Sequence, residues 1–277
     1  MTVATLAEVL RPAMREGYAV AGLVVLGWED ARAYITAAEA AGMPVILQAG
    51  PGCRANTPLP ILGAMFRHLA EGASVPVVSL LDHGKTLEEC RIALESGFSS
   101  IMFDGSRLPL DENIAQTAEA VAMAHRAGAS CEGEIGFVGY DAGEESHGTD
   151  PQEAGRFARE TGIDAMAISV GNVHLQQEAA AVIDRARLAA VQAAAPNVPL
   201  VIHGGSGVSE ADRIALARET AVAKFNIGTE LRQTFGASLR ATLEENPALF
   251  DRIGILSQAE AAMAQTAENI IGAFGPK

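Results

Sequence analysis

The chain has 277 residues, of which 49% are hydrophobic, and its formal net charge is −14 at pH 7. This negative charge argues against nucleic acids and anionic membranes as partners, because both repel an acidic protein. The N-terminal residues have neither a basic region nor a long apolar run, and the three cysteines follow no metal-ligand spacing, so we expect a cytoplasmic protein with reduced thiols.

Short apolar runs alternate with longer segments of helical periodicity. The runs that predict strands are 18–26, 44–49, 77–82, 100–104, 130–135, 165–170, 199–203 and 223–227. The intervening segments that predict helices include 86–96, 111–127, 151–161, 183–195 and 209–220. Eight apolar strands alternating with helices favour a closed parallel (β/α)8 TIM barrel, which is routinely a single domain of about 250 residues. Residues 232–277 predict two extra C-terminal helices, so that 1–277 form one domain with a helical arm.

Three histidines follow predicted strands. His83 follows the third strand, His174 the sixth and His203 the seventh. Active sites of barrels lie at the C-terminal ends of the strands, so we expect the three imidazoles to meet at one depth. Three neutral imidazoles with an open coordination position are typical of a catalytic zinc ion. The sequence therefore predicts a site for one Zn²⁺ per subunit, or for another divalent metal ion.

Acidic residues accompany these histidines. Asp82 is either a turn residue or, beside a ligand histidine, an acid/base that moves a proton at a substrate oxygen, and we favour the second interpretation. Asp104 and Glu134 end the fourth and fifth strands, where they would orient the ligands or provide an alternative metal position. Lys224 precedes a strand end and is expected to be structural, with no role as a Schiff base.

A glycine-rich loop, 204–207, precedes a helix predicted to begin near Ser209. Glycines let backbone amides approach an anion, and the N-terminus of a helix favours negative charge. Barrels often bind phosphate with the loops after the seventh and eighth strands. We therefore predict a phosphate site here, to which Asn226 and Thr229 would contribute hydrogen bonds.

Together these motifs resemble the class II, metal-dependent fructose-bisphosphate aldolase family, in particular its tagatose-bisphosphate and ketose-bisphosphate branch. The resemblance spans nearly the whole chain and is carried by LLDHG around His83, IMFDGS at 101–106, EGEIG at 132–136, the segment 149–174, VPLVIHGGSG at 198–207 and KFNIGTEL at 224–231. It implies that His83, His174 and His203 bind zinc and that Asp82 is the catalytic acid/base. The residues implied to bind dihydroxyacetone phosphate are Gly171, Gly204, Gly205, Ser206, Asn226, Ile227, Gly228 and Thr229.

The implied activity is the reversible cleavage of a ketose phosphate or bisphosphate to dihydroxyacetone phosphate and an aldehyde through a zinc-stabilised enediolate. The resemblance also implies a homodimer or homotetramer in which the arm takes part, with Arg252 as the candidate to reach a neighbouring site. Members of the family have a base in the loop after the fifth strand, which here is 139–145, and Glu144 or Glu145 would serve.

One departure from the family concerns Leu175, which follows His174 where relatives have a glycine that helps to hold phosphate and a monovalent cation. The metal ligands are therefore intact, whereas the substrate-binding residues are altered. Two alternatives follow. One is an aldolase of the same fold that uses an unphosphorylated or branched keto-sugar donor. The other is a non-catalytic partner subunit of an aldolase.

Overall fold

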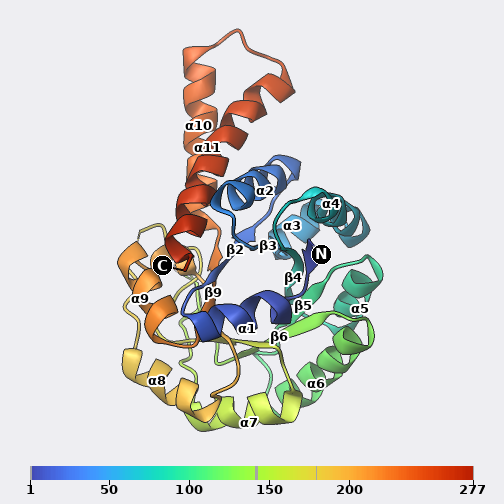
Figure 1. Ribbon diagram of the computed structural model, residues 1–277, viewed down its shortest axis with the longest axis vertical. Helices are drawn as coiled ribbons and strands as arrows, with labels where there is room; N and C mark the ends of the chain where they lie inside the picture. The colour runs from blue at the N-terminus through green and yellow to red at the C-terminus, as the bar shows by residue number, and fades with distance from the viewer. Residues whose placement is uncertain (1, 141–142, 179, 277) are drawn as a thin grey trace.

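The computed structural model describes residues 2–140, 143–178 and 180–276, and its centre is a closed barrel of parallel strands (Figure 1). The barrel strands are β2 (Val20–Val24), β3 (Val45–Ala49), β4 (Val77–Gly84), β5 (Ser100–Phe103), β6 (Ser130–Ile135), β7 (Ala165–Ile168), β8 (Leu200–Ile202) and β9 (Val222–Ile227). Each strand pairs with the next, and β9 pairs with β2 to close the ring. A short strand, β1 (Val3–Ala4), pairs with β4. The predicted TIM barrel is thus confirmed.

Helices surround the barrel, and those predicted from periodicity lie within two residues of their expected limits. The helices are α1 (Leu6–Glu16), α2 (Trp28–Ala41), α3 (Pro51–Asn56), α4 (Leu59–Gly72), α5 (Leu87–Glu95), α6 (Leu110–Arg126), α7 (Pro151–Thr161), α8 (Arg185–Ala194), α9 (Glu210–Glu219), α10 (Thr229–Glu245) and α11 (Arg252–Phe274). Polar side chains fix their starts: Thr86 accepts a hydrogen bond from the amide of Glu89, and Ser209 accepts one from that of Asp212.

Helix α1 lies across the N-terminal end of the barrel (Figure 1). Its apolar face, which includes Leu6 and Leu10, packs against small and branched side chains of the barrel interior such as Ala167 and Val201. This packing fills the N-terminal end of the barrel with apolar side chains. The open face is therefore the C-terminal one, where the polar strand ends lie.

The two C-terminal helices form the predicted arm, which extends away from the barrel (Figure 1). The second helix, α11, returns along α10 and packs against α2. At the far end of the arm, Phe250 is 91% exposed and Ile253 is 77% exposed. Lys277 lies outside the described residues. Among the helices described, none combines the length and the apolar character that a membrane crossing requires.

Candidate active site

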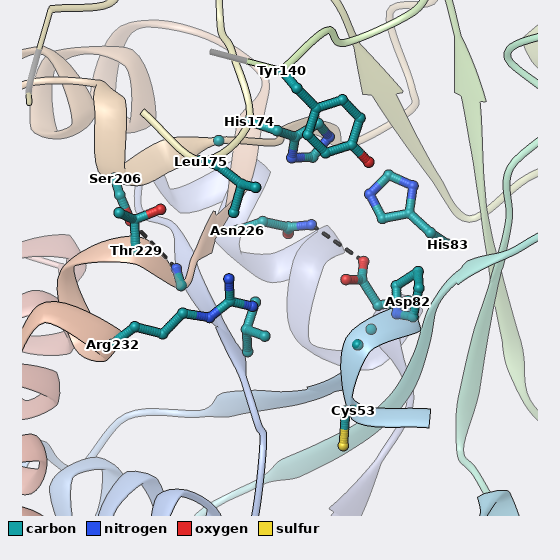
Figure 2. Close-up of a pocket in the computed structure, with 16 residues that line it drawn as sticks. Cys53, Asp82, His83, Tyr140, His174, Leu175, Ser206, Asn226, Thr229 and Arg232 are labelled. Carbon is teal, nitrogen blue, oxygen red and sulfur yellow. Dashed lines mark hydrogen bonds between the residues drawn. The ribbon is translucent and has the colours of Figure 1, made fainter. Parts of the chain in front are cut away.

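The three predicted histidines meet at the C-terminal end of the barrel, and Figure 2 shows two of them, His83 and His174. His83 belongs to the end of β4, His174 to the loop after β7, and His203 directly follows β8. Each offers a ring nitrogen, and these nitrogens all lie within 4.8 Å of one another. His83 has a φ of +54°, a left-handed conformation that costs a non-glycine residue about 1 kcal/mol or more. Such strain is typical of a residue held in place for a function.

Two carboxylates adjoin the histidines. Asp104 Oδ2 lies 2.7 Å from Nδ1 of His83 and also forms an ion pair with Lys85. Glu134 Oε2 lies 3.7 Å from the same nitrogen and 3.6 Å from Nδ1 of His203. With His83, these two carboxylates form a second group whose ligand atoms are close enough to hold a metal ion. The structure therefore brings Asp104 and Glu134 to the positions that the sequence predicts, whereas nothing in the sequence indicated Lys85.

A buried chain of charges supports His203 from the opposite side. Nε2 of His203 lies 3.1 Å from Oε1 of Glu132, and Lys224 Nζ donates to Oε2 of Glu132 over 2.6 Å. All three side chains are fully buried. Lys224 is thus the structural residue that we expected. Glu132 was missed because its strand, SCEGEI, places two glutamates in the barrel interior, and sequence alone does not show which one pairs with lysine.

Unsatisfied polar atoms show that the histidine cluster suits a divalent metal ion. His203 Nδ1 and Glu134 Oε2 are buried and have no hydrogen-bond partner among the described residues. Leaving such atoms unpaired costs about 1–3 kcal/mol each, and a metal ion would satisfy them. Imidazole and carboxylate are also the ligand types that zinc and related ions prefer.

The pKa values of the clustered histidines also suit the binding of a cation. Burial opposes a charge on His83, but the carboxylates of Asp82, Asp104 and Glu134 outweigh this effect and raise the pKa of His83 to about 9. Burial and the neighbouring imidazoles hold the pKa of His174 well below its usual value, so this ring is neutral and able to donate its lone pair. Excess negative charge around His83 would therefore attract a cation.

Asp82 lines the same cavity, beside the histidines (Figure 2). Its carboxylate is almost fully buried and accepts a hydrogen bond of 3.4 Å from Nδ2 of Asn226. The backbone around it is fixed by Arg54, whose guanidinium donates to the carbonyl oxygens of Ala49, Asp82 and His83 over 2.6, 2.6 and 3.0 Å. Arg54 is 28 and 29 positions away from Asp82 and His83 in the sequence, so no local motif reveals its role.

The predicted phosphate site forms the other end of the cavity. Gly204, Ser206, Gly228 and Thr229 line it, and Ser206 Oγ accepts hydrogen bonds from the amides of Gly228 and Glu230 over 3.3 and 3.4 Å. The N-terminus of α10 thus points toward this end. The remaining residues of the predicted set, which do not line the cavity, are Gly171, Gly205 and Ile227.

Two of these three residues have packing roles. Gly171 is exposed and has a φ of +99°, and a side chain there would meet the carbonyl oxygen of Val182 at 2.2 Å. Ile227 is fully buried in the core. Family motifs include residues that shape a loop as well as residues that face a ligand, and only the folded structure separates them.

The loop after β6 covers the histidines with an aromatic ring. Tyr140 stacks on His174 with ring centroids 5.0 Å apart and lines the cavity (Figure 2). Of the two expected bases, Glu144 forms an ion pair of 2.6 Å with Arg107 outside this cavity, and Glu145 is exposed. Asp141 and Ala142 of the same loop lie outside the described residues. Among the described residues of this loop, Tyr140 is the one that lines the cavity, a position that sequence reasoning did not predict.

Leu175, at the position where the resemblance implies a glycine, has a backbone conformation that favours glycine. Its φ is +58°, in the left-handed region, and its half-exposed side chain lines the cavity between the histidines and Ser206 (Figure 2). The aliphatic side chain of Leu175 therefore covers this part of the cavity wall.

Comparison with known proteins agrees with this geometry. Residues 4–277 match the family described as "Fructose-bisphosphate aldolase class-II". A 6-phospho-5-dehydro-2-deoxy-D-gluconate aldolase of Shouchella clausii (strain KSM-K16) is 36% identical, over 98% of this chain and 94% of that protein. A fructose-bisphosphate aldolase of Streptococcus pyogenes serotype M3 is 35% identical, over 99% and 98%. The crystal structure of the YdjI aldolase from Escherichia coli K12 superposes with a TM-score of 0.85 at 31% identity, covering 99% of this chain and 98% of that one. The chain belongs to the class II fructose-bisphosphate aldolase family and is an aldolase.

Proposed function

We propose that the protein is a metal-dependent aldolase that reversibly cleaves a ketose phosphate or bisphosphate to dihydroxyacetone phosphate and an aldehyde. The observation that carries this proposal is the meeting of three imidazoles, with ligand atoms within 4.8 Å of one another, of which His83 and His174 line a cavity together with Asp82. The glycine-rich loop at Gly204 and the N-terminus of α10 border the same cavity and suit an anionic group.

His83, His174 and His203 would hold the metal ion, and Zn²⁺ is the ion that we propose. When bound, the ion withdraws electrons from the donor carbonyl and acidifies the adjacent C–H bond. Burial of the site favours this chemistry, because charges interact more strongly away from bulk water. The pair of Glu132 and Lys224 would keep the ring of His203 in one orientation.

Asp82 would move the proton on the acceptor oxygen. In cleavage, it accepts the proton from the hydroxyl of the carbon that becomes the aldehyde. The C=O double bond then forms, the carbon–carbon bond breaks, and its electron pair stays with the donor fragment. In synthesis Asp82 returns the proton to the aldehyde oxygen. Asn226 holds the carboxylate for this task through its side-chain amide. The candidates for proton exchange at the donor carbon remain Glu144 and Glu145, and Glu144 would first have to leave Arg107.

The substrate is proposed by class. Two relatives of nearly equal identity have names that specify different substrates, a phosphorylated keto-deoxygluconate and fructose bisphosphate, and both are phosphorylated sugars. The second candidate, an unphosphorylated or branched keto-sugar donor, is favoured by Leu175, which narrows the phosphate end of the cavity. The complete set of His83, His174, His203 and Asp82 supports an active enzyme over a non-catalytic partner subunit.

We also propose a homodimer or homotetramer that uses the arm. Phe250 and Ile253 are largely exposed at its end, and burying them against a second copy would remove apolar surface from water. Arg252 is 81% exposed, and its guanidinium lies 3.6 Å from Glu29 of the same chain. The three free, buried cysteines support a reducing, cytoplasmic location.

The test is hydrogen exchange into dihydroxyacetone phosphate in heavy water, followed by NMR. The metal-loaded protein should exchange one C–H proton of this donor, and a chelator should stop the exchange. His203→Ala serves as the inactive control. Exchange that persists with the chelator would contradict the metal dependence, and no exchange with dihydroxyacetone phosphate but exchange with dihydroxyacetone would favour the unphosphorylated donor.

A further inference from the structure

We propose that the hydroxyl of Tyr140 binds an oxygen of the acceptor aldehyde and thereby makes the enzyme prefer acceptors that have a hydroxyl group next to the carbonyl. This inference rests on the proposed function, and it names a specificity-determining residue for the acceptor half of the reaction. Tyr140 lies in the loop after β6 and lines the cavity beside His174, and its hydroxyl points toward His83 (Figure 2).

The two ends of the cavity differ in their side chains (Figure 2). Ser206 and Thr229 lie at one end, next to the glycine-rich loop and the N-terminus of α10, where the donor would bind. Asp82, His83 and Tyr140 lie at the other end. Since Asp82 would move the proton on the acceptor oxygen, the acceptor would occupy the end of the cavity that contains Tyr140.

Tyr140 contributes the hydroxyl group at the acceptor end. Among the described residues that line the cavity, the others with hydroxyl groups are Ser206 and Thr229, at the donor end. An ionised carboxylate such as that of Asp82 only accepts hydrogen bonds, and the imidazoles would be occupied by the metal ion. A hydroxyl oxygen next to the carbonyl of the acceptor would therefore receive its hydrogen bond from Tyr140.

The hydroxyl of Tyr140 is available to a ligand. Within the described part of the chain it forms no hydrogen bond, and the residue is 42% exposed, whereas the hydroxyl of the buried Tyr34 donates to a backbone carbonyl oxygen over 3.2 Å. The carboxylate nearest to His83, that of Asp104, pairs with both His83 and Lys85. A phenol is protonated at neutral pH, so Tyr140 is a hydrogen-bond donor without a partner in the protein.

The backbone around Tyr140 holds its ring beside the proposed metal ligands. The amide of Tyr140 donates to the carbonyl oxygen of Glu144 over 3.1 Å, and the amide of Gly143 donates to the carbonyl oxygen of Tyr140 over 3.0 Å. The amide of His174 donates to the carbonyl oxygen of Gly139 over 2.8 Å, and the rings of Tyr140 and His174 stack at an interplanar angle of 27°. These contacts attach Tyr140 to the segment of a metal ligand, so its hydroxyl stays at the acceptor end of the cavity.

The experiment compares the full-length, Zn²⁺-loaded wild type with Tyr140→Phe and Tyr18→Phe. Tyr140→Phe keeps the stacked ring and removes only the hydroxyl. Tyr18 packs against the apolar cluster at the N-terminal end of the barrel, so its variant is a matched control for the loss of a tyrosine hydroxyl. Addition of dihydroxyacetone phosphate is measured to glycolaldehyde, which has a hydroxyl next to its carbonyl, and to acetaldehyde, which lacks one.

We expect wild type to prefer glycolaldehyde in kcat/KM, and Tyr140→Phe to lose about 3- to 10-fold of this preference, the effect of one neutral hydrogen bond. Hydrogen exchange into dihydroxyacetone phosphate alone should change less, because this half-reaction has no acceptor. Zn²⁺ binding to Tyr140→Phe, measured by calorimetry, should match that of wild type, and Tyr18→Phe should behave as wild type throughout. An unchanged preference in Tyr140→Phe, or an equal loss with both aldehydes, would overturn the proposal.

Isotope-labelled tyrosine, observed by NMR at the Cζ carbon, provides a measurement that needs no catalysis. The chain has three tyrosines, so the signal that is missing from Tyr140→Phe belongs to Tyr140. Glycolate added to the Zn²⁺-loaded wild type should shift this signal more than acetate, which has no hydroxyl. Equal shifts with the two acids, or none with glycolate, would contradict the hydroxyl contact. If wild type uses dihydroxyacetone phosphate neither in exchange nor in addition, the proposed function fails, and the glycolate titration still decides the role of Tyr140.

Discussion

Replacement of Lys224 by methionine tests the buried chain of charges behind His203. Lys224 and Glu132 are both fully buried, and their charged atoms lie 2.6 Å apart. Burial opposes ionisation of Glu132, but Lys224 and His203 outweigh it and lower the pKa of this carboxyl to about 2. The folded wild type is therefore stabilised by this group above pH 4.5, and the stabilisation is lost as the pH falls toward 2.

In Lys224→Met, Glu132 would be a buried carboxylate without its cation. Breaking such a pair costs about 3–5 kcal/mol of the free energy of unfolding. The carboxyl can avoid part of this cost by binding a proton, since protonating an ordinary glutamate at pH 7 costs about 3.5 kcal/mol. We therefore expect a destabilisation of about 3.5 kcal/mol at pH 7.

The pH dependence of this destabilisation identifies its cause. In the variant the folded pKa of Glu132 is raised, so the folded state gains a proton and the loss relative to wild type shrinks as the pH falls. Protonation at pH 5.5 costs only about 1.4 kcal/mol, so the difference should decrease by about 2 kcal/mol between pH 7 and pH 5.5.

Urea unfolding at both pH values, with a chelator present so that metal binding does not contribute, measures this difference. Lys85→Met is the matched control, because Lys85 pairs with Asp104 but its side chain is 51% exposed, and its loss should cost less than about 1 kcal/mol. A destabilisation by Lys224→Met that is below 1 kcal/mol, or equal at the two pH values, would refute the reasoning.

Three further substitutions test the site. His203→Ala should abolish binding of a divalent metal ion, measured by calorimetry, together with turnover; full activity with bound zinc would remove His203 from the ligand set. Asp82→Asn should keep the metal ion but lower the rate of carbon–carbon cleavage about 10²- to 10⁴-fold, and a wild-type rate would make Asp82 structural. Leu175→Gly should raise the free energy of unfolding by about 0.5 kcal/mol, because the left-handed φ costs leucine about 1–2 kcal/mol whereas glycine loses about 0.4–1 kcal/mol more entropy on folding. A clear decrease in the free energy of unfolding, measured in urea, would show that the side chain of Leu175 contributes packing that outweighs this strain.

Much of the architecture could be predicted from local patterns. Each of the eight apolar runs forms a barrel strand. One face of such a strand packs against the surrounding helices and the other against side chains of the barrel interior, so both faces are apolar. The strand ends then located the three histidines, since parallel strands place all their C-terminal ends at one face. The prolines and glycines between segments, such as Asn246-Pro247, marked where helices end.

Only the tertiary structure decided which polar residues serve which histidine. Glu132 and Lys224 are separated by 92 positions, and Arg54 holds the carbonyl oxygen of Asp82 from 28 positions away. Such pairs depend on strand register and on the angle at which each side chain enters the barrel, which local periodicity does not encode. The sequence by itself determined the fold and which residues gather at the strand ends, because both follow from periodicity. The orientation and support of those residues depend on contacts between distant segments that exist only in the closed barrel.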